Sequence, residues 1–162
     1  MDEHDLKALA ALDLYNMPGQ LIRRLQQIAV SIWLDETATS EMRPVQFAAL
    51  SAIRACPGLD QMALSRVVAF DRSTIQDVVV RLVKRNWARR DADPQDLRRR
   101  VLFITTEGER VLDSIEAENR RAQERILEPL SPEEQVVFME LMSRMVKVNN
   151  RFSRAPLNGE QA

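Results

Sequence analysis

The chain is poor in the residues on which most enzymes, metal proteins and secreted scaffolds depend. Its 162 residues include one cysteine, Cys56, and one histidine, His4. A disulfide within the subunit is therefore excluded, and no residues show the spacing of a metal-ligand pair. The sequence also lacks a phosphate-binding loop and a G-x-S-x-G nucleophile turn. We expect a protein that is not an enzyme and that holds no cofactor or metal ion.

Long apolar runs are missing as well. No run approaches the roughly 18 residues that a membrane helix needs. The acidic beginning of the chain has no basic region of the kind that opens a signal peptide. Together with the single cysteine, these absences predict a cytoplasmic protein. The hydrophobic fraction of 45% is sufficient for one domain with a real core.

The chain as a whole has almost no net charge, but one segment has an excess of positive charge. The formal net charge is -1, yet the segment from Arg81 to Arg100 holds eight basic and three acidic residues and so carries +5. The rest of the chain must sum to about -6. A solvated helix face followed by an ordinary hairpin could explain this segment. The hairpin context favours contact with the phosphates of DNA instead.

The scarcity of glycine and the helical spacing of the apolar residues predict a mainly α fold. The first long helix begins near Asn16–Pro18 and the second near Pro44. Asp60 and Asp71 are expected to cap the third and fourth helices. The core-facing stripe of the fourth helix reads Ile75, Val78, Val79 and Leu82.

After the fourth helix the sequence predicts a β-hairpin and two more helices. Asn86 ends the helix, and "WARRDA" pairs with "RRVLFIT" around "DPQDL". Thr106 and Glu109 are expected to form the capping box of a helix that runs to about Glu128, and Ser131 caps the last helix. Two short helices, a polar-faced helix and a basic hairpin are the parts of a winged helix-turn-helix.

The fourth helix and the hairpin supply candidate DNA contacts. Ser, Thr and Gln side chains can read base edges, a valine can meet a thymine methyl, and an aspartate can accept from a cytosine amino group. Basic side chains can bind phosphates or guanine. The predicted DNA-binding residues are Arg72, Ser73, Thr74, Gln76, Asp77, Val80, Arg81, Lys84, Arg98, Arg99 and Arg100.

The sequence resembles the MarR family of bacterial transcriptional regulators over roughly residues 15–152. The resemblance rests on "PVQFAALSAI", on "LDQMALSRVVAFDRSTIQDVVVRLVKRNWARR" and on the wing run "DLRRRVLFITTEG". It implies a homodimer, built by the first and last helices, that binds a pseudo-palindromic operator in double-stranded DNA and usually represses. Leu97 stands where the first wing arginine of the family usually lies, so which of the next three arginines enters the minor groove stays open.

We expect the chain to divide as the resemblance implies. Residues 1–42 form the N-terminal dimerisation helix, and residues 43–106 form the winged helix-turn-helix lobe that binds DNA. Residues 107–154 form the C-terminal helices that complete the dimerisation region, and residues 155–162 are a flexible tail.

The first helix also carries a candidate ligand site. Arg23 and Arg24 interrupt a mostly apolar stretch, and neighbours about 100° apart cannot both point directly away from its apolar stripe. Salt bridges at the surface or the dimer interface are the simpler interpretation. The stretch resembles the first helix of family members that control aromatic or nicotinate catabolism. That resemblance implies that Tyr15, Arg23 and Arg24 bind a small aromatic acid effector.

The function that these features favour is a homodimeric repressor released by such an acid. Cys56 is expected to be a small buried residue, although a redox-responsive repressor acting through Cys56 is an alternative. A helical dimeric protein-interaction module without DNA binding is the alternative from another class.

Overall fold

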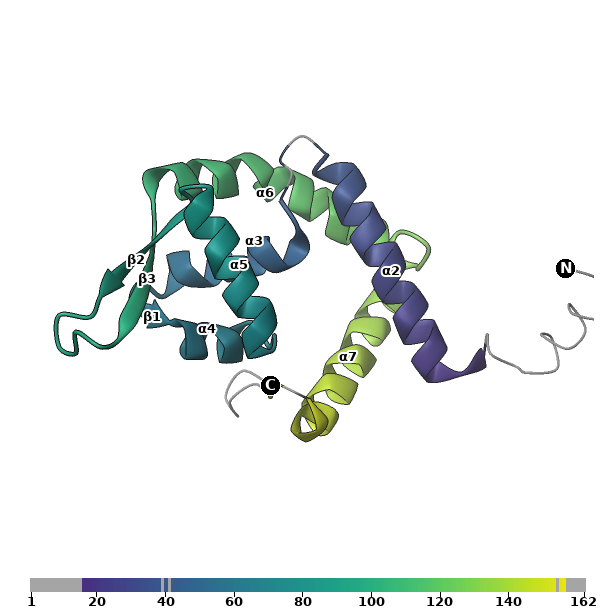
Figure 1. Cartoon of the computed structure of the whole chain (residues 1–162). Coiled ribbons are helices and arrows are strands. Elements are labelled where there is room, and N and C mark those ends of the chain that lie inside the picture. The colour runs from purple at the N-terminus through teal and green to yellow at the C-terminus, as the bar shows by residue number, and fades with distance from the viewer. Residues whose placement is uncertain (1–15, 39, 41, 154, 157–162) are drawn as a thin grey trace, which may run out of the picture.

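The computed structural model describes residues 16–38, 40, 42–153 and 155–156. The elements in chain order are α2 (Pro18–Glu36), α3 (Pro44–Ala55), β1 (Leu59–Asp60), α4 (Gln61–Val67), α5 (Arg72–Lys84), β2 (Ala88–Ala92), β3 (Arg100–Ile104), α6 (Thr106–Leu127), α7 (Pro132–Asn149) and the 3-10 helix η2 (Asn150–Phe152). We call α3, β1, α4, α5, β2 and β3 the winged lobe. Figure 1 shows this lobe on one side, α2 and α7 on the other, and α6 running between them.

The helices of the winged lobe begin at the predicted residues. The carboxylates of Asp60 and Asp71 accept the third backbone N–H of α4 and α5, at 2.7 and 2.9 Å. Each carboxylate satisfies an orphan donor at the positive end of its helix. Before α7, Ser131 and Glu134 form the predicted capping box, each side chain accepting from the backbone N–H of the other. These predictions are confirmed.

The predicted start of α6 was wrong by one residue. Thr105, not Thr106, is the N-cap, and its hydroxyl oxygen accepts the N–H of Gly108 at 3.0 Å. The same hydroxyl donates to the carbonyl of Asn86. Because β3 ends at Ile104, Thr105 is the residue that still has the extended backbone an N-cap requires. Asn86, predicted to end the fourth helix, directly follows the C-cap Arg85 and has a left-handed φ of 57°.

The wing belongs to a sheet of three strands, in the order β1-β3-β2. β2 and β3 pair antiparallel, with Ala88 opposite Ile104 and Ala92 opposite Arg100, which confirms the predicted hairpin. The third strand was missed, because the two residues of β1 are too few to show an alternating pattern. Leu59 of β1 pairs with Leu102 of β3, so the base of the wing is joined to the start of α4.

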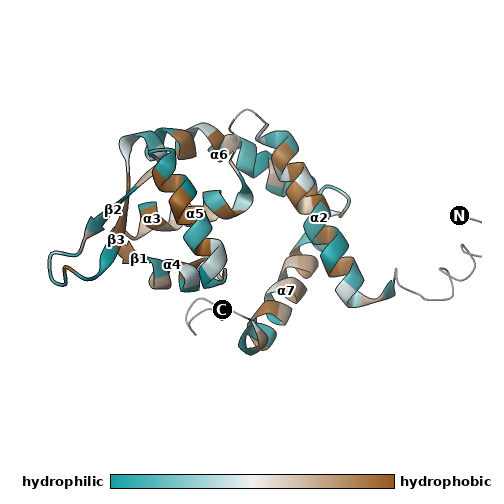
Figure 2. Cartoon of the chain, in the orientation of Figure 1, coloured by the Kyte–Doolittle hydropathy of each residue, from teal (hydrophilic) through white to brown (hydrophobic). Residues whose placement is uncertain are grey.

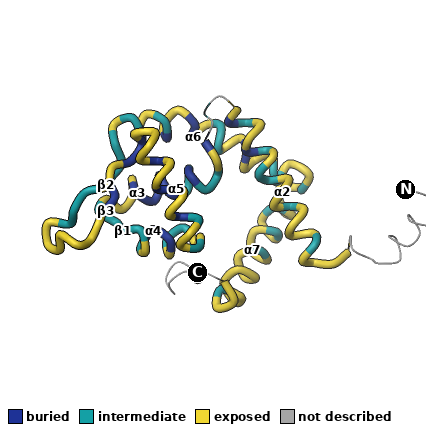
Figure 3. The backbone as a smooth tube through the Cα atoms, viewed as in Figure 1, coloured by how far each residue is buried: buried dark blue, intermediate teal, exposed yellow. Residues whose placement is uncertain are grey.

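The core centres on α3 and α5 of the winged lobe, where Figure 3 colours several stretches of backbone as buried. Buried residues of α2 and α6 belong to the same cluster, namely Trp33 of α2 and Leu112, Ile115 and Ala122 of α6. All four side chains of the predicted stripe on α5 are buried, at 5% exposure or less. Burial of each such aliphatic side chain contributes roughly 1.5–3 kcal/mol. This stripe therefore fixes the rotation of α5 about its axis.

By contrast, α7 lacks a buried face in the single chain. Every residue of this helix falls within the described part, and each is exposed or half-buried. Figure 2 nevertheless shows apolar residues along α7. Those between 47% and 66% exposed are Val136, Val137, Met139, Leu141, Met145, Val146 and Val148. An apolar surface of this extent is typical of an interface.

Gly108 occupies a position in α6 that has no room for a side chain. A methyl group there would lie 2.0 Å from the carbonyl oxygen of Trp87 and 2.8 Å from Cγ1 of Ile104. We expect Gly108→Ala to lower the free energy of unfolding by roughly 1–3 kcal/mol or more, because α6 must move away from the hairpin. Urea unfolding followed by circular dichroism at fixed protein concentration measures the change.

The matched control is Gly19→Ala in α2, where a methyl group meets nothing within 4 Å. It should leave the stability unchanged or raise it by up to about 1 kcal/mol, because alanine favours the helix. Equal stability of the two variants would contradict the close packing at Gly108.

Candidate nucleic-acid interface

The side of α5 opposite its buried stripe is presented to solvent. Ser73, Gln76 and Asp77 are exposed, and Val80 is 55% exposed although it is apolar. Thr74 is half-buried, and the basic residues Arg72, Arg81 and Lys84 are exposed. The packing that holds α5 in place thus leaves every predicted base-reading side chain of this helix at least partly accessible.

Asp71 organises the first turn of α5 beyond its role as a cap. Its carboxylate accepts from the hydroxyls of Ser73 and Thr74, at 2.6 and 2.8 Å, as well as from the N–H of Thr74. The bond from the Ser73 hydroxyl, followed by those from Thr74, holds the pKa of Asp71 well below its usual range. Each hydroxyl donates its one hydrogen to Asp71 in a hydrogen bond. The hydroxyl oxygens of Ser73 and Thr74 therefore have only lone pairs left for a further partner. They are therefore suited to accept from amino groups on base edges.

The wing is tied to the start of α4 through Arg99. Nη2 and Nε of Arg99 lie 2.7 and 2.9 Å from Oδ2 of Asp60, and Nη1 lies 3.5 Å from Asp93 at the wing tip. The pKa of Asp60 is lowered, chiefly by the N–H of Ala63 and further by Arg99. The three wing arginines are all exposed, but Arg99 is held by two carboxylates, whereas no ion pair among the described residues engages Arg98 or Arg100.

Part of the positive charge of the wing is neutralised within the protein. Arg89 pairs with Asp91, and its guanidinium lies 4.5 Å over the ring of Phe103. Arg90 donates to the side chain of Gln61 at 2.9 Å, which joins β2 to α4. Because the net charge of +5 from Arg81 to Arg100 already counts Asp91, these contacts orient Arg89 and Arg90 and do not lower that charge further.

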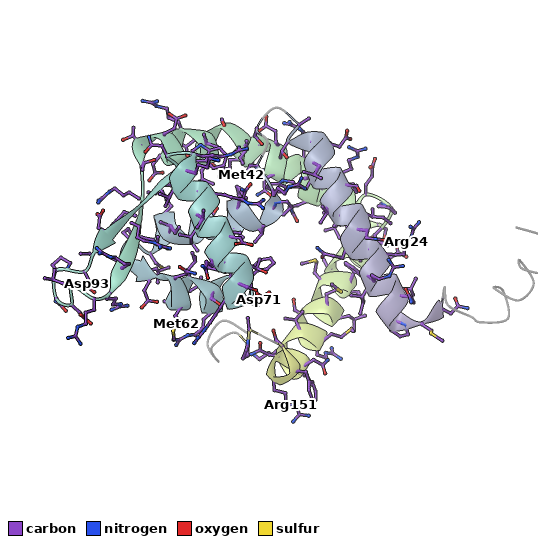
Figure 4. All side chains as sticks on the ribbon, in the orientation of Figure 1. Arg24, Met42, Met62, Asp71, Asp93 and Arg151 are labelled. Atoms are coloured by element: carbon purple, nitrogen blue, oxygen red, sulfur yellow. The ribbon has the colours of Figure 1, made fainter. Side chains whose placement is uncertain are left out.

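The predicted contacts divide into two groups along α5. Figure 4 places Met62 and Asp71 at the edge of the winged lobe where α4 and α5 meet, and Asp93 at the end of the wing. At the other end of α5, Arg81 and Lys84 line a cavity of about 760 Å³ together with residues of α2 and α3. Arg43 and Gln46 belong to this lining and were missed, because the apolar spacing of the second helix pointed only to packing.

The predicted ligand residues lie apart from this cavity. Tyr15 falls outside the described residues. Arg23 and Arg24 are exposed on α2, and Arg23 donates to the side chains of Gln20 and Gln27 on its own helix, at 3.0 and 3.2 Å. In Figure 4, Arg24 is far from the wing tip.

The expectation of a buried Cys56 was wrong, because this residue is exposed. It is the C-cap of α3, where the chain leaves the helix with φ -132° and turns toward β1. The core-facing stripe of α3 ends before this position, with Ala52 and Ile53.

Within the part of the chain that the structure describes, no helix has both the length and the apolar character that a membrane crossing requires. Nor do the described side chains include a group of three or more His, Cys, Asp or Glu able to hold a metal ion.

Comparisons with known proteins agree on one family. A model described as "MarR family" matches residues 40–99. The chain is 32% identical to the transcriptional regulator HosA of Escherichia coli O111:H- over 133 residues, which are 82% of this chain and 97% of that protein. It is 41% identical to the PcaV transcriptional regulator from Streptomyces coelicolor. The crystal structure of PcaV in complex with its natural ligand matches with a TM-score of 0.76, over 82% of this chain and 94% of that one. BpsR of Bordetella bronchiseptica, whose DNA binding is regulated by 6-hydroxynicotinic acid, is 25% identical with a TM-score of 0.76 over 80% of this chain and 93% of its own.

The capping carboxylates predict how stability depends on pH. The folded-state pKa of Asp71 and of Asp60 lies below the ordinary value of 3.8, so both stabilise the fold above that value. This stability is lost as the pH falls through the folded-state values. We expect the melting temperature to hold between about pH 5 and 7 and to fall below about pH 4. Asp71→Asn should lower the melting temperature at pH 7 and should make its fall below pH 4 less steep. Asp77→Asn, on the exposed side of α5, should leave the fall of the melting temperature as steep as in the wild type.

Proposed function

Because this chain belongs to the MarR family of transcriptional regulators, we propose that it is a homodimeric repressor that binds a pseudo-palindromic operator and is released by a small aromatic acid. Like other members of this family, the chain is a DNA-binding regulator and not an enzyme. The operator, the effector and the sign of regulation are the parts that we propose.

The observation that carries the proposal is the division of α5 into a buried and a polar side. A helix fits the major groove, and the exposed Ser73, Gln76 and Val80 offer two polar side chains and one methyl-bearing side chain to base edges. Arg98 and Arg100 on the wing are placed to reach phosphates or the adjacent minor groove. Arg99 orients the wing through Asp60 and takes a smaller part in DNA contact.

The dimer rests on the apolar residues that the single chain leaves exposed. They lie on α7 and also on α2, where Leu21 is 54% and Ile28 is 46% exposed. A second copy that covers these helices would place a second α5 on the same side of the molecule. Successive major grooves lie about 34 Å apart on one face of DNA, so a twofold axis allows both helices to read half-sites.

The effector is proposed from α2 and from the relatives. PcaV has been solved with its natural ligand, and the DNA binding of BpsR is regulated by 6-hydroxynicotinic acid, which is an aromatic acid. Ile22 of α2 lines an apolar hollow of about 440 Å³ with Met142, Met145 and Val146 of α7. Arg23 or Arg24, which follow Ile22 in the sequence, would supply the fork for a carboxylate. Such a ligand releases the operator to the extent that it prefers the non-binding state.

Two substitutions test the DNA contact. Gln76→Ala should weaken binding by roughly 1–3 kcal/mol and relax the preference at one base pair. Arg98→Gln should weaken binding to all sequences and reduce the slope of log affinity against log salt by about one. Gel shifts with DNA from upstream of the gene, between about 50 and 200 mM salt, measure both. Failure of the wild type to prefer that DNA over random DNA at about 150 mM salt would favour the protein-interaction module.

A thermal-shift screen of aromatic and heteroaromatic acids tests the effector. We expect 6-hydroxynicotinate or a related acid to raise the melting temperature, because a ligand that binds the folded protein stabilises it. The Arg23→Ala/Arg24→Ala double variant should lose that shift and should keep its operator bound in the presence of the acid. An unchanged shift in this variant would exclude the two arginines as the carboxylate anchor.

A further inference from the structure

The cavity at the junction of α2, α3 and α5 is lined by two predicted DNA-binding residues, Arg81 and Lys84. Its other lining residues belong neither to the predicted DNA contacts nor to the aromatic acid site. Its volume of about 760 Å³ lies in the range of small-molecule sites, roughly 300–1,000 Å³. α2 contributes Leu34 and Ala38, the segment before α3 contributes Met42, and α5 contributes its last turn. The cavity thus touches both the recognition helix and a helix outside the winged lobe.

Basic side chains converge on this cavity from two elements. Arg43 is the N-cap of α3, and Arg81 and Lys84 lie three residues apart on one side of α5. Arg85 also lines the cavity, and its guanidinium is engaged 4.8 Å over the ring of Trp87. The positive end of the 12-residue α3 adds to the same field, since its first turn has no acidic residue.

No acidic residue occurs among the described residues that line the cavity. The nearest acids along α2, Asp35 and Glu36, are paired with Arg125 and Arg121 of α6 instead. Among the described ion pairs, none engages Arg43, Arg81 or Lys84. Arg81 and Lys84 complement the dipole at the C-terminal end of α5, and this could explain their position. It does not explain why Arg43 lines the same cavity.

The walls of the cavity are held in place by buried hydrogen bonds. The indole N–H of Trp33 donates to the carbonyl of Met42 at 3.2 Å, and the hydroxyl of Thr37 donates to the carbonyl of Trp33 at 2.8 Å. The side chain of Gln46, which is 5% exposed, accepts from the N–H of Arg43 at 2.9 Å. A site whose backbone is fixed in this way loses little entropy when a ligand binds.

We propose that this cavity binds a small phosphate-bearing organic molecule. Its phosphate lies against Arg43, Arg81 and Lys84, and its organic part lies against Leu34, Ala38 and Met42. A phosphate monoester carries a charge of nearly -2 at neutral pH and offers three acceptor oxygens, so it matches several basic side chains better than one carboxylate does. The apolar wall and the volume favour an organic phosphate over the free ion.

The consequence for regulation rests on the proposed function. Arg81 and Lys84 belong to α5, so a bound phosphate lowers the positive charge that this helix presents to DNA. The ligand also contacts α2 and α5 together, and thereby favours one distance between them. Operator binding is then weakened by a second class of effector, distinct from the aromatic acid.

Calorimetry on the full chain, with phenyl phosphate as the probe, tests the site without DNA. We expect one phenyl phosphate per chain and weaker binding of inorganic phosphate, which leaves the apolar wall unused. Arg43→Gln should weaken phenyl phosphate binding roughly tenfold. Arg98→Gln removes the same charge from the wing and should leave binding unchanged. Equal loss in the two variants, equal affinity for the two phosphates, or no heat from the wild type at millimolar probe would each overturn the proposal.

A gel shift distinguishes a free phosphate ligand from a phosphate of the DNA backbone. Without probe, Arg43→Gln should bind the operator like the wild type, whereas Arg98→Gln should bind it more weakly. Phenyl phosphate should weaken operator binding by the wild type and leave Arg43→Gln unaffected. A loss of operator affinity in Arg43→Gln as large as in Arg98→Gln, without probe, would mean that the cavity holds a backbone phosphate and would refute a free ligand. The calorimetry stands even where no operator is found.

Discussion

The burial of one stripe of α5 is the constraint on which the rest of the structure depends. Ile75, Val78, Val79 and Leu82 pack into the core of the winged lobe and fix the helix about its own axis. Their burial leaves Ser73, Gln76 and Val80 outside, because the two sides of one helix cannot both be buried in so small a lobe. The proposed DNA-recognition surface is thus the side of α5 that does not pack into the core. A change in the core that rotated α5 would move the surface as well.

Charge in the wing is divided between structure and recognition. Arg89, Arg90 and Arg99 have partners within the protein, and the pairing of Arg99 with Asp60 joins the wing to the cap of α4. Asp60 therefore serves two elements at once, since its carboxylate also accepts the backbone N–H that starts α4. A wing held in this way would present its remaining basic side chains in a fixed direction, and this would reduce the entropy lost in the proposed binding to DNA.

Helix α6 connects the winged lobe to the rest of the molecule. α6 leaves the wing, packs along α2 and leads to α7, so the winged lobe and the exposed apolar helices share one element. Ion pairs of Arg121 and Arg125 with the end of α2 hold this junction. Trp33 of α2, whose ring lies 5.1 Å from that of Phe47 of α3, adds a direct contact between α2 and the winged lobe. The proposed ligand between α2 and α5 would act on the spacing of these two parts.

The sequence by itself determined the helices, their caps and the buried stripe, because capping and helical spacing depend on residues within one or two turns. It also determined the family, since those local signals occur in a fixed order. Only the tertiary structure decided that Thr105 caps α6, that Cys56 is exposed and that Arg99 pairs with Asp60. The first depends on where β3 ends, and the second depends on how α3 is covered. The third depends on a contact between residues 39 positions apart in the chain. Such contacts leave no periodic signal, and the cavity at Arg43 and Lys84 arises in the same way, from helices that meet only in the folded chain.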